Sequence, residues 1–296
     1  MLGIMLGLFF GVGMGYLHDF LDNAIKAPED LDEVVKIPIL GVIPRIADYN
    51  SDFVSLARHM LRFPKSAISE GFRAIRTSIH LTEIKKQGSR AMLVCSCEPN
   101  EGKTVFACNL AVSLAQDGKR TLLIDADLRR SSIHKAFYQA RSPGLSEVLA
   151  GLESFDSAVI NSLVDDQGKE LKNLSLLCAG SRSHSPAELI GSSEMAALME
   201  EAKNKYDMVV YDSGAALMVA ETSILASHIG EIVIITRAGS SSRRKVSGLK
   251  KQLENLHCRI IGGVLNDFRP KRFRGYNYGY GYQYGNYQEE KGEAVS

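Results

Sequence analysis

The sequence CSCEPNEGKT, residues 95–104, decides the fold of this chain. The apolar run AMLV at 91–94 precedes it with the length of a strand, and apolar residues at helical spacing follow it from 105 to 114. A strand, a tight loop and a helix that opens on Gly-Lys-Thr are the context of a phosphate-binding loop, in which backbone N–H groups form a cage for anions. We expect Lys103 to contact the terminal phosphates and the Thr104 hydroxyl to bind Mg²⁺.

The loop departs from the usual phosphate-binding pattern at one position. The pattern has glycine six residues before the lysine, and this chain has Cys97 there. Gly-Lys-Thr alone is a weak signal, because short tripeptides recur by chance, and a loop that only caps a helix is the alternative interpretation. The flanking strand and helix favour nucleotide binding.

Acidic residues follow two further apolar runs. The run TLLI at 121–124 leads to Asp125 and Asp127, and the run MVVY at 208–211 leads to Asp212. Asp125 and Asp127 point the same way on an extended chain, because side-chain direction alternates along a strand. Ligands of open α/β sheets bind at the C-terminal edge of the strands. These carboxylates and the Gly-Lys-Thr loop together predict a site for ATP and Mg²⁺.

Composition bounds the class of protein. A chain of 296 residues with 45% hydrophobic content can bury a large core and fits one sizeable domain with appendages. A formal net charge of +1 argues against a general nucleic-acid binder. The five cysteines lie mostly in apolar patterns, without a second close pair beside Cys95 and Cys97, so we expect buried, reduced thiols rather than a zinc site.

The first 17 residues are unlike a soluble domain. They are uncharged and rich in Leu, Phe, Met and Gly, and acidic residues follow them. Their length is at the short end of the range of about 17 to 25 residues that spans a bilayer, and their glycine spacing resembles that of packed membrane helices. We interpret residues 1–17 as the end of a transmembrane helix; a buried helix is the alternative. Residues 18–66 read as a juxtamembrane linker, in which PILGVIP at 38–44 is too broken by Pro and Gly to form a long element.

Residues 67–268 read as a compact α/β domain. We expect strands near 91–96, 121–125, 174–178, 208–212, 232–236 and 260–265, and helices at 67–86, 104–117, 145–149, 186–204 and 243–256. Strands that alternate with helices predict a doubly wound, mostly parallel sheet. On the helix at 67–86, Glu70, Arg73 and Arg76 fall on one broad face, where a simple solvated ion pair is the alternative interpretation.

The composition changes sharply after residue 268. A basic cluster opens the segment 269–296, and six tyrosines then alternate with Gly, Asn and Gln, without an aliphatic residue that could build a core. Such a segment is expected to be disordered. Its tyrosines could be structural, in a sticky low-complexity tail, or acceptors of phosphoryl groups. They are Tyr276, Tyr278, Tyr280, Tyr282, Tyr284 and Tyr287.

Taken together, the motifs resemble those of the bacterial tyrosine kinases, the cytoplasmic part of exopolysaccharide or capsule co-polymerases that regulate chain length. The resemblance covers nearly the whole chain. It is carried by the loop, with Ser96, Pro99 and Glu101–Thr104; by Asp-x-Asp-x-Arg at Asp125, Asp127 and Arg129; by Asp212 after an apolar strand; by Glu-x-x-Arg-x-x-Arg at Glu70, Arg73 and Arg76; and by LGVIP at 40–44, Asn266 and the tyrosine tail.

The resemblance implies a P-loop NTPase fold with deviant Walker motifs and an ATP- and Mg²⁺-dependent tyrosine autokinase. It implies nucleotide binding by Pro99, Asn100, Glu101, Gly102, Lys103, Thr104 and Val105, with Asn266 near the adenine; catalysis by Lys103, Asp125, Asp127 and Asp212; and metal binding by Thr104, Asp125 and Asp212. Asp125 or Asp127 would accept or orient the phenol proton, and the sequence does not choose between them.

The resemblance also implies partners and a location. Glu70, Arg73 and Arg76 would join copies of the chain in a ring, and the tail tyrosines would be phosphorylated in trans. A cognate tyrosine phosphatase and the polysaccharide polymerisation and export machinery would be the other partners, without nucleic acid. The N-terminal helix would anchor the protein in the bacterial inner membrane with its catalytic domain in the cytoplasm.

One departure from the family keeps other functions open. The family has proline two residues after the third aspartate, and this chain has Gly214 followed by Ala215. Glycine loosens the backbone where proline would fix φ. A partition- or division-type ATPase and a non-catalytic ATP-binding scaffold are the alternatives. The first usually carries a lysine five residues before the loop lysine, where this chain has Glu98.

Overall fold

The computed structural model describes residues 22–45, 52–82 and 90–269, together with isolated positions among residues 3–14. The expected transmembrane segment 1–17, apart from those positions, and the tyrosines of the tail lie outside the described residues. Within the described part of the chain, no helix is both long and apolar enough to cross a membrane.

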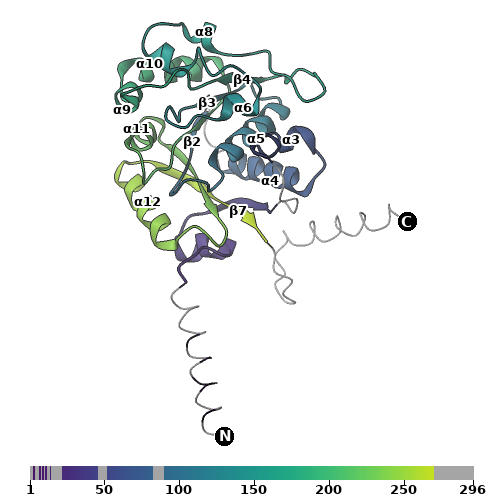
Figure 1. Ribbon diagram of the computed structural model, residues 1–296, viewed down its shortest axis with the longest axis vertical. Helices are drawn as coiled ribbons and strands as arrows, with labels where there is room; N and C mark the ends of the chain where they lie inside the picture. Colours follow the sequence, from purple (N-terminus) through teal and green to yellow (C-terminus); the bar gives the residue numbers. More distant parts are fainter. Residues whose placement is uncertain are drawn as a thin grey trace, which may run out of the picture.

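One sheet of seven parallel strands forms the centre of the molecule (Figure 1). The strand order is β1-β7-β6-β2-β5-β3-β4, so the strand that leads into the phosphate-binding loop, β2, is central. Parallel pairing joins every neighbouring pair, as the alternation of strands and helices predicts. The strands are β1 (Ile39–Pro44), β2 (Arg90–Ser96), β3 (Thr121–Asp125), β4 (Leu174–Leu177), β5 (Met208–Asp212), β6 (Glu231–Arg237) and β7 (Arg259–Phe268).

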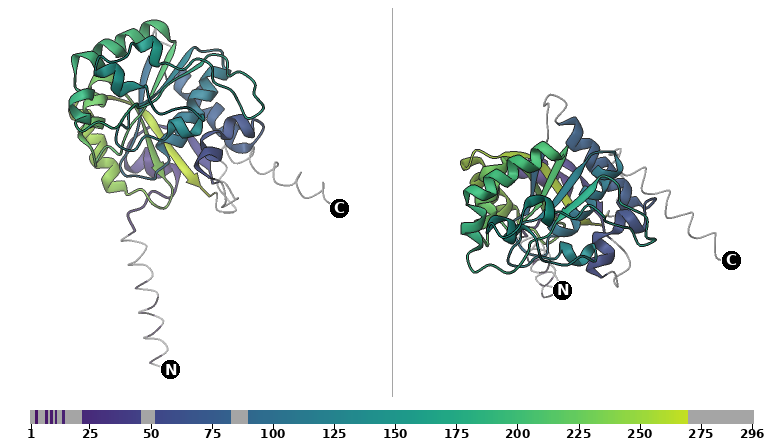
Figure 2. Two further views of the ribbon diagram at one scale, coloured as in Figure 1. Left: turned by 45° about the horizontal axis from the view of Figure 1, so that its top comes forward. Right: turned by 90° about the horizontal axis from the view of Figure 1, so that it is seen from above.

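Helices cover both faces of the sheet (Figure 2). On one face lie α2 (Phe53–Ala57), α3 (His59–Arg62), α4 (Ala67–Leu81), α5 (Lys103–Gln116) and α6 (Ile133–Ala136). On the other lie α7 (Leu145–Leu149), α8 (Phe155–Ala158), α9 (Pro186–Ile190), α10 (Ser193–Lys205), α11 (Ala220–Ile229) and α12 (Arg243–Asn255). The π-helical turn η1 (Asp30–Val34) packs against α12.

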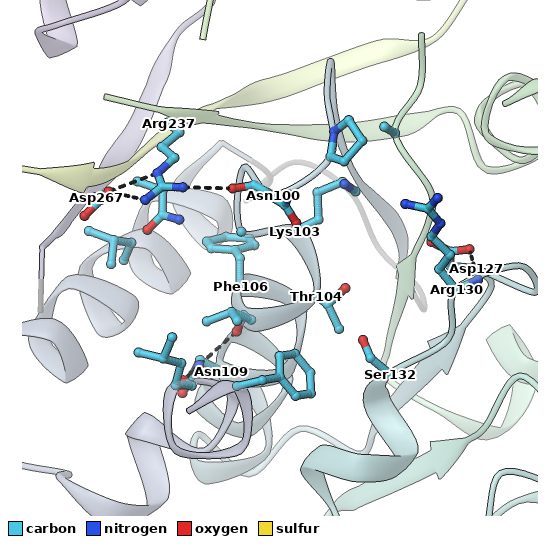
Figure 3. Close-up of a pocket in the computed structure, with 18 of the residues that line it drawn as sticks. Asn100, Lys103, Thr104, Phe106, Asn109, Asp127, Arg130, Ser132, Arg237 and Asp267 are labelled. Atoms are coloured by element: carbon cyan, nitrogen blue, oxygen red, sulfur yellow. Dashed lines mark hydrogen bonds and ion pairs between the residues drawn. The ribbon is translucent and has the colours of Figure 1, made fainter. Parts of the chain in front are cut away.

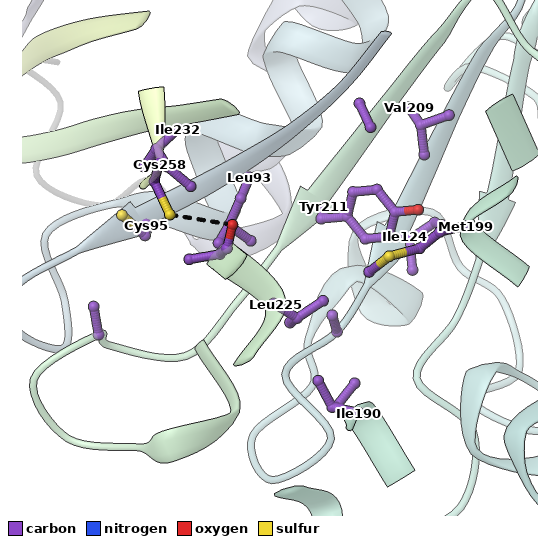
Figure 4. Close-up of a cluster of buried hydrophobic side chains, with 14 of the residues drawn as sticks. Leu93, Cys95, Ile124, Ile190, Met199, Val209, Tyr211, Leu225, Ile232 and Cys258 are labelled. Atoms are coloured by element: carbon purple, nitrogen blue, oxygen red, sulfur yellow. Dashed lines mark hydrogen bonds between the residues drawn. The ribbon is translucent and has the colours of Figure 1, made fainter. Parts of the chain in front are cut away.

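Each face of the sheet has its own hydrophobic core because side chains alternate along the strands. In β2, Leu93 and Cys95 enter the core beneath α9–α12, whereas Met92 and Val94 enter the core beneath α4 and α5. Figure 4 shows the first core, with Cys258 donating from Sγ to the carbonyl of Ala226 at 3.3 Å. All five cysteines are buried and form no disulfide.

The predicted doubly wound α/β fold is confirmed, but several details differ from the expected elements. The expected helix 186–204 is two helices, because the chain turns at Gly191 and the Ser192 hydroxyl caps a new helix by accepting from Met195 N. Helix α11 and the short helices α6 and α8 were not predicted. Helix α4 ends at Leu81, and residues 83–89 lie outside the described residues.

A further difference concerns the expected linker 18–66. Residues 39–44 form β1, an edge strand paired with β7, and residues 53–62 form α2 and α3 against α5. Edge strands tolerate proline and short length, which is why the broken PILGVIP run still joins the sheet. The folded body therefore begins well before residue 66.

Candidate nucleotide site

The phosphate-binding loop opens onto a cavity of about 810 Å³ at the C-terminal edge of the sheet. In Figure 3, Lys103 and Thr104 lie at the start of α5, with Arg237 and Asp267 on one side and Asp127, Arg130 and Ser132 on the other. Sequence-predicted residues that line this cavity are Pro99, Asn100, Gly102, Lys103, Thr104, Val105, Asp127 and Asn266. The topology places them together, because β2 is the central strand where neighbouring connections diverge.

The backbone of the loop has the left-handed turn that its sequence permits. Gly102 has φ +100° and immediately precedes α5, so a side chain at this position would be strained. Asn100 also has positive φ, +65°, which asparagine tolerates better than most residues. The first turn of α5 begins at Lys103, and its unpaired N–H groups are suited to an anion.

Two carboxylates lie side by side beneath the loop. Asp125 and Asp212 end the neighbouring strands β3 and β5 in register, and they are 0% and 1% exposed. Burial raises the pKa of Asp125 well above its ordinary value, and the charge of Asp212 raises it further. Burial also raises the pKa of Asp212, to about 7, although the Thr104 hydroxyl and the Lys103 ammonium act in the opposite direction. Two buried acids that cannot easily ionise together are favourable surroundings for a cation.

The hydrogen bonds of this acidic pair show where a cation fits. Asp125 has several hydrogen-bond donors. Its carboxylate accepts from the backbone N–H groups of Asp127 at 3.3 Å and of Ser132 and Ile133 at 3.2 Å. Asp212 Oδ1, by contrast, is buried and has no hydrogen-bond partner among the residues that the structure describes. A buried carboxylate oxygen without a donor is costly, and a divalent cation with oxygen ligands would satisfy it. The residues present therefore fit Mg²⁺ near Thr104 and Asp212.

Asp127 lies in different surroundings from Asp125. Strand β3 ends at Asp125, so Asp127 belongs to the turn that follows and is not directed by the pleat of the strand. It lines the cavity, is partly exposed, and accepts from Arg130 N at 2.8 Å. Asp125 and Asp212 do not line the cavity but lie behind its wall.

The segment after Asp212 is held without the family's proline. Ala216 N donates to the Ser96 carbonyl at 2.8 Å, and the Thr222 hydroxyl donates to the Gly214 carbonyl at 3.1 Å. A Cβ atom at position 214 would lie 2.9 Å from Val219 Cγ2 and 3.6 Å from an oxygen of Asp127. Glycine thus lets the segment pack closely against Asp127, and hydrogen bonds replace the restraint that a proline ring would give.

Glu101 and Asn266 have contacts within the protein. Glu101 is 3% exposed, does not line the cavity, and accepts from Glu98 N at 2.8 Å. The side chain of Asn266 lines the cavity and donates from Nδ2 to the Glu101 carbonyl at 3.0 Å.

The expected oligomerisation residues lie on α4, away from the cavity lining. Arg73 pairs with Glu70 and donates to the Pro64 carbonyl at 2.6 Å. Arg76 donates to the Ser113 carbonyl at 2.8 Å and lies 3.3 Å from a carboxylate oxygen of Asp117. All three are engaged within the chain in this structure.

Sequence reasoning missed the basic and acidic residues at the far end of the cavity. Arg237, at the end of β6, donates from Nε to Asp267 at 3.0 Å and from Nη1 to the Asn100 carbonyl at 3.4 Å. Arg45 lies 3.5 Å from the other oxygen of Asp267. The sequence did contain a signal for these residues, because Arg237 and Asp267 lie near the ends of two further predicted strands. The C-terminal ends of parallel strands meet at one edge of the sheet, where the cavity lies.

Comparison with known proteins places this geometry in a family. Residues 92–278 match the CobQ/CobB/MinD/ParA nucleotide binding domain. The chain is 36% identical to the tyrosine-protein kinase YwqD of Bacillus subtilis over 215 residues, which cover 73% of this chain and 87% of YwqD. The chain belongs to the bacterial tyrosine kinases.

Two further members of the bacterial tyrosine kinases define how much of the chain is shared. A putative tyrosine-protein kinase EpsB of Ralstonia solanacearum is 30% identical over 295 residues, covering 96% of this chain and 37% of EpsB. This chain therefore spans little more than a third of that relative's length. The kinase domain of the Escherichia coli tyrosine kinase ETK superposes with a TM-score of 0.74 at 26% identity, covering 86% of this chain and all of that domain.

Proposed function

We propose that this chain is an ATP- and Mg²⁺-dependent tyrosine autokinase that phosphorylates its own C-terminal tyrosine cluster in trans. Its membership of the bacterial tyrosine kinases supports the reaction class. The single structural observation that carries the proposal is Oδ1 of Asp212, which is buried beside Asp125 behind the phosphate-binding loop and has no hydrogen-bond partner within the described part of the chain. A cation bound there would neutralise charge on the phosphates of ATP.

The residues of the chain then have separate roles. Lys103 and the N–H groups of the loop hold the terminal phosphates, and Thr104 and Asp212 hold the cation, with Asp125 behind them. Pro99, Asn100, Gly102, Val105 and Asn266 form the surrounding wall. Glu101 supports the loop from within, since its side chain does not line the cavity.

Asp127 is the better candidate for the proton of the acceptor tyrosine. It lines the cavity and its carboxylate is partly exposed, whereas Asp125 is enclosed and already accepts three backbone hydrogen bonds. A phenol has a pKa of about 10, so a carboxylate that orients it and accepts its proton is needed near neutral pH.

The same proposal includes the cellular setting. Residues 1–17 would anchor the protein in the bacterial inner membrane with the nucleotide site in the cytoplasm, and Glu70, Arg73 and Arg76 would join copies in a ring. The acceptors would be the six tail tyrosines named above. A tyrosine phosphatase and the machinery that polymerises and exports exopolysaccharide would be its partners; the Eps name of one relative supports that role.

Mixing two variants tests transfer in trans. A Lys103→Met chain that keeps its tail is incubated with radiolabelled Mg-ATP and an active chain truncated after Arg274. Label is expected on the inactive, full-length chain. Absence of phosphotyrosine on either chain and in the wild type would overturn the kinase proposal.

Two parallel measurements separate the alternative functions. Release of inorganic phosphate without phosphotyrosine would indicate a partition- or division-type ATPase. Binding of ATP without either product would indicate an assembly scaffold.

A further inference from the structure

The phosphate-binding loop has a second, buried side that faces away from the cavity. Its centre is the carboxylate of Glu101, which is almost fully enclosed. One oxygen accepts from the N–H of Glu98 at 2.8 Å, and the other accepts from the hydroxyl of Ser241. A buried carboxylate is stable only with such donors, and hydrogen bonds to charged groups are stronger than neutral ones.

Ser241 belongs to the turn between β6 and α12, 140 residues further along the chain. Its side chain is buried, and its oxygen accepts from the N–H of Arg237 at 2.7 Å. That bond directs the single hydroxyl hydrogen towards Glu101. Arg237 also reaches the loop itself, through its bond to the Asn100 carbonyl.

Backbone hydrogen bonds hold this turn in place from the other side. Ile25 N donates to the Ser241 carbonyl at 2.8 Å, Gly239 N donates to the Ile25 carbonyl at 2.7 Å, and Arg243 N donates to the Asn23 carbonyl at 2.8 Å. Ile25 is fully buried in the core between these segments. Ser241 is therefore a fixed donor, not a freely moving side chain.

We propose that Ser241 is a positioning residue for nucleotide binding, which acts through Glu101. Its hydroxyl holds a negative charge on the side of the loop away from the phosphates, and keeps the loop N–H groups turned towards the cavity. Without this donor, the Glu101 carboxylate would be buried with one partner fewer and would turn towards solvent or the cavity, where it repels phosphate. The proposal rests on the nucleotide site of the proposed function but not on transfer to tyrosine.

The test compares Ser241→Ala with Ser240→Ala in the full-length protein. Ser240 lies in the same turn, is exposed, and has no side-chain hydrogen bond among the described contacts. Titration with a fluorescent ATP analogue and Mg²⁺ should show a Kd about tenfold higher for Ser241→Ala than for wild type, and an unchanged Kd for Ser240→Ala. KM for ATP should rise by the same factor, with kcat at saturating ATP within about twofold of wild type. A Kd within about twofold of wild type for Ser241→Ala would overturn the proposal.

A double-mutant cycle separates positioning from general loss of structure. In a Glu101→Ala background, where no charge needs to be held, Ser241→Ala should change the Kd by less than about twofold. A full tenfold effect in that background would contradict an action through Glu101. If Ser241→Ala does not fold, Ser241→Cys replaces it, with a weaker donor of similar size and an expected loss of about threefold; an unchanged Kd for that variant would also overturn the proposal.

Two outcomes distinguish this proposal from the kinase proposal. Nucleotide binding that depends on Ser241 in a protein that forms no phosphotyrosine would retain the positioning role and reject the kinase. Tyrosine phosphorylation with unaltered nucleotide affinity in Ser241→Ala would do the reverse.

Discussion

The charged residues of the nucleotide site and those on α4 have opposite surroundings. Asp125 and Asp212 are excluded from water, whereas the side chains of Glu70 and Arg73 are 55% and 30% exposed. Burial changes the protonation of the first pair, while water and salt screen the second pair. A charged motif in the sequence therefore predicts where the charges lie, but their contribution to stability depends on how much water the fold leaves around them.

The largest effect is expected for Lys103, the buried cation that balances the acidic pair. Lys103→Met removes the charge that we propose holds the phosphates, and it should reduce tyrosine phosphorylation by on the order of 10³ or more. Transfer of radiolabelled phosphate measures this, and circular dichroism checks the fold. Lys119→Met, at an exposed lysine in the turn after α5, is the matched control and should keep full activity. A fully active Lys103→Met protein would refute the loop assignment.

Substituting the carboxylates compares the buried acids Asp125 and Asp212 with the partly exposed Asp127. Asp125→Asn, Asp127→Asn and Asp212→Asn should each lower the phosphorylation rate by on the order of 10² to 10⁴. Asp212→Asn should at the same time raise the Tm of the nucleotide-free protein, because it removes a buried charge beside Asp125. Asp127→Asn should leave the Tm nearly unchanged. Rate assays and thermal unfolding measure the two properties, and near-full activity of any variant would remove that residue from the mechanism.

The pH dependence of stability tests the buried pair directly. The pKa of Asp212 rises from 3.8 to about 7 on folding, so the unfolded chain loses this proton at lower pH than the folded protein does. Ionisation of Asp212 therefore lowers the free energy of unfolding progressively between about pH 4 and 7, after which the cost is constant. Urea unfolding of metal-free wild type and Asp212→Asn should show a stability gap in favour of the variant that widens over this range. A stability gap that stays constant from pH 4 to 8 would show that folding does not raise the pKa of Asp212.

The smallest effects are expected on α4. Arg73→Ala removes an exposed ion pair and should change the free energy of unfolding by less than about 1 kcal/mol. Arg76→Ala should cost more, about 1 kcal/mol, because the bond from Arg76 to the Ser113 carbonyl is partly buried, whereas the bond from Arg73 to the Pro64 carbonyl is exposed to water. Both variants should reduce the mass of the assembly in light scattering while the isolated chain remains folded. An unchanged mass for both would separate these arginines from assembly.

The sequence predicted the elements whose local pattern agrees with their environment. Six of the strands, α5 and the strand-end acids have apolar runs that end at loops, and the structure has them at nearly the predicted residues. Strand β1 was missed because its Pro and Gly match a linker, and only pairing with β7 makes it a strand. Helix α11 is short, and its sequence AETSILASHI mixes apolar and polar residues without a clear helical periodicity.

The site was predicted less completely than the fold, for a physical reason. Lys103, Thr104, Asp127 and Asn266 belong to recognisable motifs and line the cavity. Arg237 and Ser241 contact the loop from more than a hundred residues away, and no local pattern marks a residue whose role is defined by tertiary contact. Exposure, which separates Asp127 from Asp125, is likewise a property of the packed sheet.

The position of β2 in the sheet has a consequence for the newly made chain. Both neighbours of this strand, β5 and β6, are encoded more than a hundred residues after it. At a synthesis rate of about 5 to 20 residues per second, the ribosome needs on the order of ten seconds to supply them. During that time β2 has two open edges and an apolar sequence, which is a combination prone to association with other chains. Nascent chains on neighbouring ribosomes are thus exposed to mispairing at the segment that later binds the nucleotide, so protection by a chaperone is most valuable between the synthesis of β2 and that of β6.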